Sequence, residues 1–236
     1  MALILNIETS TAVCSVSLGK DGDLLAYKEN KEGMNHATHL TVFIDRILKE
    51  NSLTPNDLDA IAVSMGPGSY TGLRIGVSTA KGLCYGSKLP LIAVSTLQAM
   101  TAPLLSDEAI TSQLGDLEAS IFCPMIDARR MEVYTAFYSY KNEVLRKVSA
   151  EIIDEESFVS DLAENEIVFF GDGSSKCQSS LQSPNAIFVD DITPTAIGMI
   201  ELSEAKYKVE AFEDVAYFEP FYLKDFVATT PKKNIF

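Results

Sequence analysis

The chain has 236 residues, 47% of them hydrophobic, and 33 Asp and Glu against 19 Lys and Arg give a formal net charge of −14. This composition excludes an intrinsically disordered chain, and such an acidic surface repels phosphate backbones, which argues against unaided binding of nucleic acid. The first residues, MALILNIETS, lack the basic lead and long apolar core of a signal peptide. No apolar run approaches the roughly 20 residues that span a bilayer. We therefore expect a cytoplasmic protein without a membrane segment.

Short apolar runs alternate with turn and helix signals through the first part of the chain. Thr9-Ser10-Thr11 and Gly19-Lys20-Asp21-Gly22 mark turns, and Thr54-Pro55 is typical of a helix cap. A further helix capped by Ser95 or Thr96 is expected to end at Pro103. The periodicity predicts strands over 3–8, 13–18, 24–30, 60–65 and 91–94, and helices over 36–51 and 73–85.

The same order of elements returns after a polar, loop-like stretch over 106–120. Strands are expected over 121–126, 132–140, 144–152 and 167–170, with a short helix capped by Asp154 before the last of them. That last strand runs into Gly171-Asp172-Gly173-Ser174, an echo of Gly66-Pro67-Gly68-Ser69. Two matching junctions in matching contexts predict an internal duplication into two related α/β lobes, over 1–105 and 106–236.

The loop GPGSYTGLRIG, residues 66–76, raises the question of a phosphate site. A Walker loop needs a lysine after its last glycine, but Leu73 follows Gly72 here, and the spacing of a dinucleotide fingerprint is also missed. Free amides at a helix start can still attract an anion. The interpretation favoured is a tight strand-to-helix turn, in which glycine permits positive φ and close backbone approach.

Small residues recur every fourth position along the helix that follows, at Gly72, Gly76, Ala80 and Cys84. Such a stripe lets another helix approach closely, either from the protein's own core or from a second chain.

The four cysteines, Cys14, Cys84, Cys123 and Cys177, form no C-x-x-C pair, so we expect buried reduced thiols.

The remaining chemical candidates are few. His36 and His39 are the only histidines, and without a third ligand they favour capping or surface roles over a metal site. Glu8 and Asp127 each follow the first strand of a lobe, where acidic residues hold magnesium in nucleotide enzymes. Ordinary local hydrogen bonding there is the alternative. Both interpretations of Glu8 and Asp127 stay open on spacing alone, the inventory of catalytic residues is thin, and we predict no metal and no cofactor for this chain.

Four segments carry a resemblance to a known family: ILNIETSTAVCSVSL, GPGSYTGLRIGVSTAKGL, IDARRMEVYTAFY and PFYLK. Together they resemble the TsaB (YeaZ) family and span nearly the whole chain. The resemblance implies the duplicated actin/sugar-kinase/Hsp70-like, ribonuclease H-like fold. It also implies a non-catalytic subunit that supports the catalytic subunit TsaD, together with the ATPase TsaE, in transferring threonylcarbamoyl to the adenosine beside the anticodon of certain tRNAs.

The resemblance further implies that the helices over 36–50 and 73–85 form an interface with TsaD, or with a second copy of the chain in its absence, and that tRNA is met only through the complex. Ala37-Thr38-His39 stands where Ser-Glu-Arg is usual, and Glu8 where aspartate is commoner. A stand-alone ATP-using enzyme with Glu8 and Asp127 near a metal is the alternative, and a metalloprotease with His36 and His39 ranks below it. The implied interface residues are His36, His39, Leu40, Phe43, Ile47, Gly68, Ser69, Tyr70, Thr71, Gly72, Arg74, Gly76 and Ala80.

Overall fold

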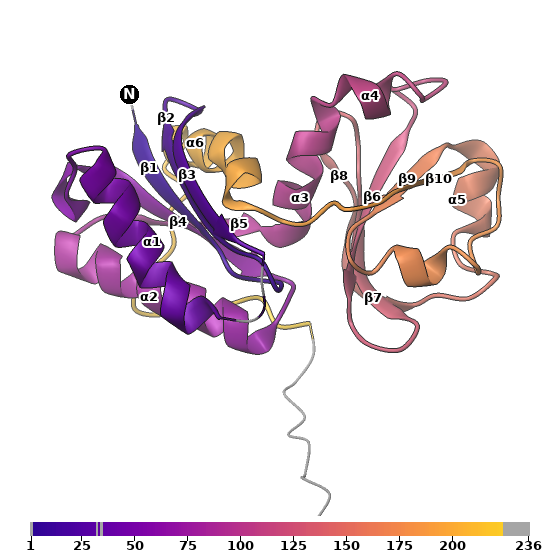
Figure 1. Cartoon of the computed structure of the whole chain (residues 1–236). Coiled ribbons are helices and arrows are strands. Elements are labelled where there is room, and N and C mark those ends of the chain that lie inside the picture. Colours follow the sequence, from indigo (N-terminus) through magenta and orange to yellow (C-terminus); the bar gives the residue numbers. More distant parts are fainter. Residues whose placement is uncertain (1, 32, 34, 224–236) are drawn as a thin grey trace, which may run out of the picture.

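The computed structural model describes residues 2–31, 33 and 35–223, which form two α/β lobes (Figure 1). The first lobe is built on a five-stranded sheet of order β3-β2-β1-β4-β5. Strand β2 runs antiparallel to β1 and β3, whereas β4 runs parallel to β1 and β5. The strands are β1 (Leu3–Glu8), β2 (Cys14–Lys20), β3 (Asp23–Asn30), β4 (Ala60–Gly66) and β5 (Leu91–Ser95).

The second lobe repeats this plan with a five-stranded sheet of order β10-β9-β6-β7-β8. Here β7 runs antiparallel to β6 and β8, whereas β9 runs parallel to β6 and β10. Each sheet thus places its first strand at the centre and its second strand antiparallel beside it. The strands are β6 (Ile121–Asp127), β7 (Glu132–Tyr138), β8 (Val144–Ile152), β9 (Ile167–Phe170) and β10 (Ala186–Val189).

This repeated topology confirms the predicted duplication and the actin/sugar-kinase/Hsp70-like fold. The two glycine junctions correspond as well, because Gly66 at the end of β4 and Gly171 after β9 both have positive φ, +108° and +102°. A long helix follows the first junction, but only a short 3₁₀ turn, η2 (Ser175–Cys177), follows the second. The duplicated halves therefore differ in the helical element that follows the glycine junction.

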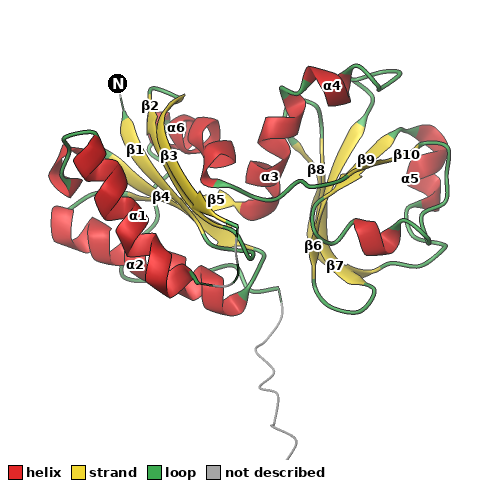
Figure 2. Cartoon of the chain, viewed as in Figure 1, coloured by secondary structure: helices red, strands yellow, loops and turns green. Residues whose placement is uncertain are grey.

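Helices cover the sheets in layers (Figure 2). Helices α1 (His36–Glu50) and α2 (Tyr70–Ser87) lie side by side on the outer face of the first sheet, and α3 (Thr96–Leu105) packs between the two sheets. Their apolar stripes fill separate core clusters on each face of the sheets. The remaining helical segments are η1 (Pro55–Asp57), α4 (Glu108–Thr111), α5 (Val159–Glu164), η3 (Ala196–Met199) and α6 (Ile200–Lys208). None of the helices within the described ranges is long and apolar enough to cross a membrane.

Three local expectations need correction. Helix α3 continues through Pro103 to Leu105. Proline removes only the bond to the carbonyl of Ala99, and η3 packs there so closely that a Cβ on Gly198 would lie 2.0 Å from that oxygen. Asp154 accepts hydrogen bonds in a turn with Ser157 instead of capping α5, which starts after it, and the predicted loop over 106–120 contains α4.

The C-terminal segment also differs from the expected division of lobes. The sequence predicts a second lobe over 106–236, but η3 and α6 pack against the first sheet. Lys206 Nζ donates to the carbonyl of Ala93 at 2.7 Å, and Glu213 pairs with Leu91 at the edge of β5. Residues beyond 223, including the last residue of the PFYLK segment, lie outside the described residues. The first lobe therefore contains residues from both the N-terminal and the C-terminal parts of the sequence.

Candidate functional site

The glycine loop joins the buried strand β4 to α2. Ser69 is the N-cap of the helix, and its hydroxyl accepts from the backbone N–H of Gly72 at 3.3 Å. A carbonyl from the segment after α6 also approaches, because a Cβ on Gly66 would lie 2.8 Å from the backbone oxygen of Phe221. The loop is thus the predicted strand-to-helix turn, with backbone packed against it.

The turn between β1 and β2 fills the space in front of this loop. The N–H of Ser69 donates to the carbonyl of Ser10 at 2.6 Å, and the Thr9 hydroxyl donates to the carbonyl of Gly72 at 2.8 Å. A Cβ on Gly68 would lie 2.4 Å from the Ser10 oxygen, and one on Gly72 would lie 2.1 Å from the Thr9 oxygen. The glycines admit the chain's own turn, so the loop does not fit a phosphate group.

The stripe of small residues on α2 faces the interior of the first lobe, and its four residues are all buried: Gly72, Gly76, Ala80 and Cys84. A Cβ on Gly76 would lie 2.3 Å from the Thr9 hydroxyl oxygen. The expectation that this stripe is an external face for a partner is therefore wrong. Its small residues are needed because α2 packs directly on the β1–β2 turn and on the first sheet.

The α1 residues of the implied interface are also mostly internal. Leu40, Phe43 and Ile47 belong to the core under the helix, with 9% exposure or less, so they cannot offer their side chains to a partner. His36 is buried too, and its Nε2 lies 2.8 Å from the carbonyl of Thr11. Since a carbonyl only accepts, Nε2 carries the proton, and burial lowers the pKa of the ring.

The remaining implied residues are accessible. His39 is half-buried, and its ring stacks on that of Phe43 with centroids 5.5 Å apart. Within residues 2–31, 33 and 35–223, no three His, Cys, Asp or Glu side chains are grouped as a metal site. The absence of a metal stays a prediction. Thr71 and Arg74 are exposed, and Gly68, Ser69 and Tyr70 are partly exposed.

The segment after α6 covers part of this accessible surface. The ring of Tyr222 packs on that of Tyr70 with centroids 4.9 Å apart, and its hydroxyl lies 3.3 Å from Arg74 Nε. The Arg74 guanidinium in turn lies 4.3 Å from the Tyr70 ring centroid. These contacts hold the first turn of α2 to the C-terminal segment, a connection that the sequence did not indicate.

The two carboxylates considered as metal ligands lie on different sheets and have different surroundings. Glu8 is fully buried, and its Oε1 accepts from the N–H of Ser10 at 2.6 Å and from the hydroxyl of Ser64 at 2.9 Å. Burial raises the pKa of Glu8 above its usual value in spite of these bonds. Burial also pushes the pKa of Asp127 up, but its hydrogen bonds to Lys176 and Arg129 outweigh this and lower it. Glu8 is therefore closed off as a metal ligand, whereas Asp127 is exposed but already paired with Lys176.

A second stripe of small residues lies on the opposite side of α2. Ser78, Gly82 and Gly86 recur every fourth position and are exposed, and a Cβ on either glycine would meet no atom within 4 Å. Tyr85 beside them is 83% exposed. Because exposed glycines inside a helix weaken it, their presence on this face suits close packing by another element. The sequence signal was available, since Leu73 and Val77 mark the other side of the helix as the buried one.

The four cysteines are free and buried, as expected. Burial raises the pKa of Cys14 to about 11 and that of Cys84 to about 12, so both thiols stay protonated near neutral pH. They serve as small apolar side chains in the core.

Comparison with known proteins shows which family this chain resembles. The family model described as "TsaD: tRNA N6-adenosine threonylcarbamoyltransferase" matches residues 30–232. The TsaB protein of Haemophilus influenzae, described as a tRNA threonylcarbamoyladenosine biosynthesis protein, is 30% identical, with 94% of this chain and 93% of that protein covered. The chain belongs to the TsaB family.

Further TsaB relatives agree. That of Escherichia coli strain K12 is 30% identical, with 95% of this chain and 96% of that protein covered. The solved structure of YeaZ from Pseudomonas aeruginosa matches with a TM-score of 0.78 at 25% identity, covering 94% of this chain and all of that one. The family is thus one of tRNA threonylcarbamoyladenosine biosynthesis proteins that share the fold over nearly their whole length.

Proposed function

We propose that this chain is a non-catalytic subunit of a tRNA threonylcarbamoyladenosine synthesis complex in the cytoplasm. It binds and activates a TsaD-like catalytic subunit and works with a TsaE-like ATPase. The observation that carries the proposal is the filled glycine loop. Thr9 and Ser10 pack directly against Gly68 and Gly72, which leaves no room for a phosphate against these glycines, and Glu8 beside them is fully buried. A chain closed in this way is suited to binding a protein rather than to turning over ATP.

The surface proposed for the TsaD-like subunit is the outer face of α1 and α2, away from the first sheet. We define the α1–α2 outer face as Thr38, Val42 and Asp45 of α1 with Arg74, Ser78, Gly82 and Tyr85 of α2, all of which are exposed. In the absence of the catalytic subunit, the same face is available to a second copy of the chain. This face replaces the buried stripe as the interface.

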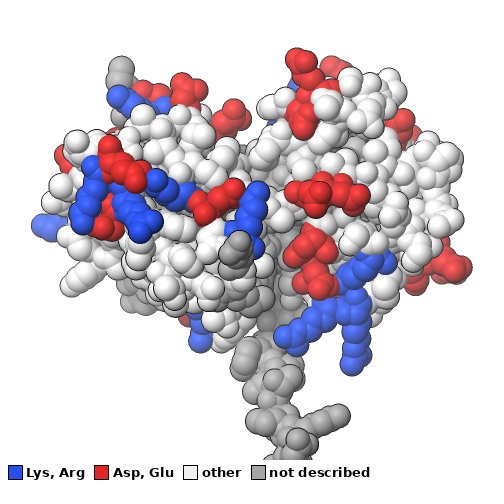
Figure 3. Space-filling view, viewed as in Figure 1, with Lys and Arg blue, Asp and Glu red and all other residues white. Residues whose placement is uncertain are grey.

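Transfer RNA is met through the complex in this proposal. Lys and Arg side chains lie in separate groups among Asp and Glu on the face shown in Figure 3, rather than in one continuous basic stripe. With a net charge of −14, such a surface supports contact with RNA mainly through a more basic subunit.

Co-purification tests the proposal. The tagged chain, expressed in its own cell, should retain the TsaD-like protein of that cell at a fixed stoichiometry through size-exclusion chromatography. A chain that elutes without it, when both proteins are present at micromolar concentration, contradicts the proposed role.

A further inference from the structure

The C-terminal segment after α6 returns to the start of α2 and holds one of its side chains in place (Figure 1). The N–H of Phe221 donates to the carbonyl of Met65 at 2.7 Å, which fixes the segment beside the glycine loop. The next residue, Tyr222, packs its ring on that of Tyr70 with centroids 4.9 Å apart. The guanidinium of Arg74 lies over the Tyr70 ring, 4.3 Å from its centroid, and its Nε donates to the Tyr222 hydroxyl at 3.3 Å. Two tyrosines that are far apart in the sequence therefore hold Arg74 in one position.

The guanidinium of Arg74 keeps most of its hydrogen-bonding capacity, and its side chain is exposed. Among the residues that the structure describes, its Nε has an acceptor and its two terminal nitrogens have none. Within the same residues, no Asp or Glu lies within ion-pair distance of it, and Glu219 attracts it only from farther away. The two terminal nitrogens match the two oxygens of a carboxylate, which is the geometry of a bidentate pair.

The position of Arg74 is fixed before any partner binds. A free arginine loses much side-chain freedom when it enters an interface, and this loss weakens binding. Here the stacking on Tyr70 and the bond to Tyr222 already restrict the side chain. Arg74 also belongs to the α1–α2 outer face, one helical turn before Ser78. A preorganised cation thus lies on the surface that we propose for the TsaD-like subunit.

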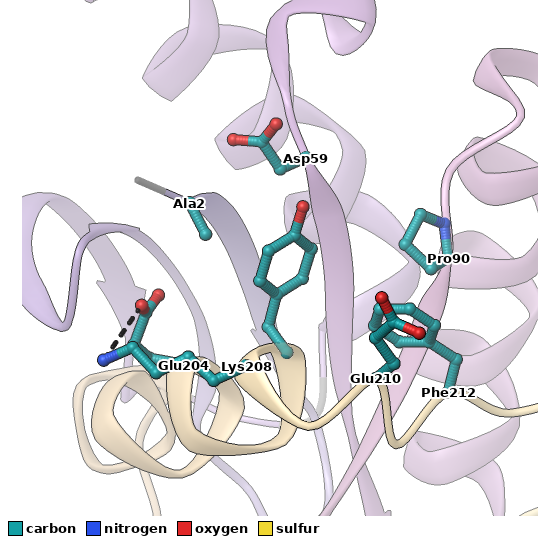
Figure 4. Close-up of a pocket in the computed structure, with 8 residues that line it drawn as sticks. Ala2, Asp59, Pro90, Glu204, Lys208, Glu210 and Phe212 are labelled. Atoms are coloured by element: carbon teal, nitrogen blue, oxygen red, sulfur yellow. Dashed lines mark ion pairs between the residues drawn. The ribbon is translucent and has the colours of Figure 1, made fainter.

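The charged groups beside α6 differ in this respect (Figure 4). A cavity of about 370 Å³ is lined there by residues that include Asp59, Glu204 and Lys208. Asp59 Oδ2 accepts from the N–H of Leu3 at 2.7 Å, and Glu204 Oε1 pairs with Lys208 Nζ at 3.3 Å. These carboxylates are engaged within the chain, whereas the terminal nitrogens of Arg74 have no such partner among the described residues.

We propose that Arg74 anchors a carboxylate of the TsaD-like subunit, and that Tyr70 and Tyr222 are positioning residues that hold its guanidinium for this pair. An Asp or Glu of that subunit accepts hydrogen bonds from both terminal nitrogens. A carboxylate fits better than a nucleic-acid backbone, since the net charge of −14 opposes the approach of a polyanion. This inference rests on the proposed function, because it assigns chemistry to one part of the α1–α2 outer face.

Titration calorimetry of the full chain with the TsaD-like protein of the same cell tests the anchor. Arg74→Gln should weaken binding on the order of ten- to hundredfold, because the partner carboxylate is then buried without its cation. Arg74→Lys keeps the charge but loses the planar fork, so its affinity should lie between those of Arg74→Gln and the wild type. Lys147→Gln is the matched control, since Lys147 is an exposed cation on β8 in the second lobe, and it should bind like the wild type.

A double-mutant cycle tests the positioning role of Tyr222. Tyr222→Phe keeps a ring against Tyr70 but removes the acceptor of Arg74 Nε, so binding should weaken roughly threefold to tenfold, as for one lost hydrogen bond. In the Arg74→Gln background the same change should have no further effect. Equal weakening in both backgrounds means that Tyr222 acts independently of Arg74, which contradicts the assignment.

The outcomes separate this inference from the proposed function. A wild-type chain that does not bind the TsaD-like subunit contradicts both. Wild-type binding that is unchanged in Arg74→Gln, or is weakened equally in Lys147→Gln, overturns the inference alone. Binding of purified tRNA to the isolated chain that is lost in Arg74→Gln identifies a phosphate ligand and also overturns it. Circular dichroism checks that the variants fold, and if Arg74→Gln does not, wild-type affinity in Arg74→Lys contradicts the bidentate pair.

Discussion

Gly72 and Gly82 lie on the same helix with opposite surroundings, and this contrast makes the packing of α2 testable at the scale of one residue. A Cβ at Gly72 would lie 2.1 Å from the backbone oxygen of Thr9, whereas a Cβ at Gly82 meets nothing within 4 Å. Gly72→Ala should therefore lower the free energy of unfolding by about 1–3 kcal/mol through overpacking. Gly82→Ala should raise it by roughly 0.5–1 kcal/mol through helix propensity. Denaturant unfolding of both variants measures the difference, and shifts of the same sign contradict the packing described.

Glu8 gives a prediction about pH. Burial raises its pKa in the folded state above the value of 4.5 that it has when unfolded. The folded protein then binds the Glu8 proton more tightly, so its stabilising contribution is complete below pH 4.5 and is lost as pH rises through the folded-state pKa. Glu8→Gln keeps an acceptor for Ser10 and Ser64 but cannot ionise.

The melting temperature of the variant should rise relative to that of the wild type as pH increases from about 4.5 towards 7. Only the wild type then has to bury an ionised carboxylate, which destabilises its folded state. Melting curves across this range check it, with Glu201→Gln as a control on an exposed carboxylate. Parallel pH profiles for wild type and Glu8→Gln are incompatible with a raised pKa.

Among the elements, those with strong periodicity were predictable and those that depend on long-range packing were not. The alternation of apolar runs and turn residues located β1, β4, β6 and β9, and the helical spacing located α1 and α2. Which side of α2 faces inward depends on the β1–β2 turn, because Thr9 and Ser10 approach Gly68, Gly72 and Gly76 from far away in sequence. Fourfold spacing of small residues occurs on both sides, so spacing alone gave the wrong side, and only the apolar Leu73 and Val77 beside one stripe indicated which side is buried.

The C-terminal segment shows the same limit. Helix α6 has only nine residues, and Glu201, Lys206 and Lys208 interrupt its apolar pattern. Its return to the first sheet is fixed by contacts such as Lys206 with Ala93, which no local pattern encodes.

The α1–α2 outer face predicts a variant that folds but does not bind. Gly82→Leu places a large side chain where a helix of the TsaD-like subunit is proposed to approach, and its Cβ would meet no atom of the chain itself within 4 Å. Affinity should fall on the order of ten- to hundredfold, the equivalent of about 1–3 kcal/mol of overpacking. Binding is measured by titration calorimetry, and the melting temperature should not fall. If the Gly82→Leu variant binds the TsaD-like subunit with the affinity of the wild type, the interface lies elsewhere.

At the scale of the whole molecule, the β1–β2 turn of the chain itself packs against the glycines of the first glycine loop. We therefore expect the isolated protein not to hydrolyse ATP. Steady-state turnover is the measurement, with Glu8→Ala as the control for contamination. ATP hydrolysis above background that disappears in Glu8→Ala contradicts the non-catalytic role and supports the alternative of a stand-alone ATP-using enzyme.

Threonylcarbamoyl transfer to tRNA, reconstituted from the TsaD-like and TsaE-like proteins of the same cell, tests the central claim most directly. The rate is compared without the chain, with the wild type, with Gly82→Leu and with Glu8→Gln. The account predicts no sustained transfer without the chain, full transfer with wild type and Glu8→Gln, and loss with Gly82→Leu. Sustained transfer without the chain contradicts it, as does failure of a Glu8→Gln chain that still binds the TsaD-like subunit, because that result assigns chemistry to the chain itself.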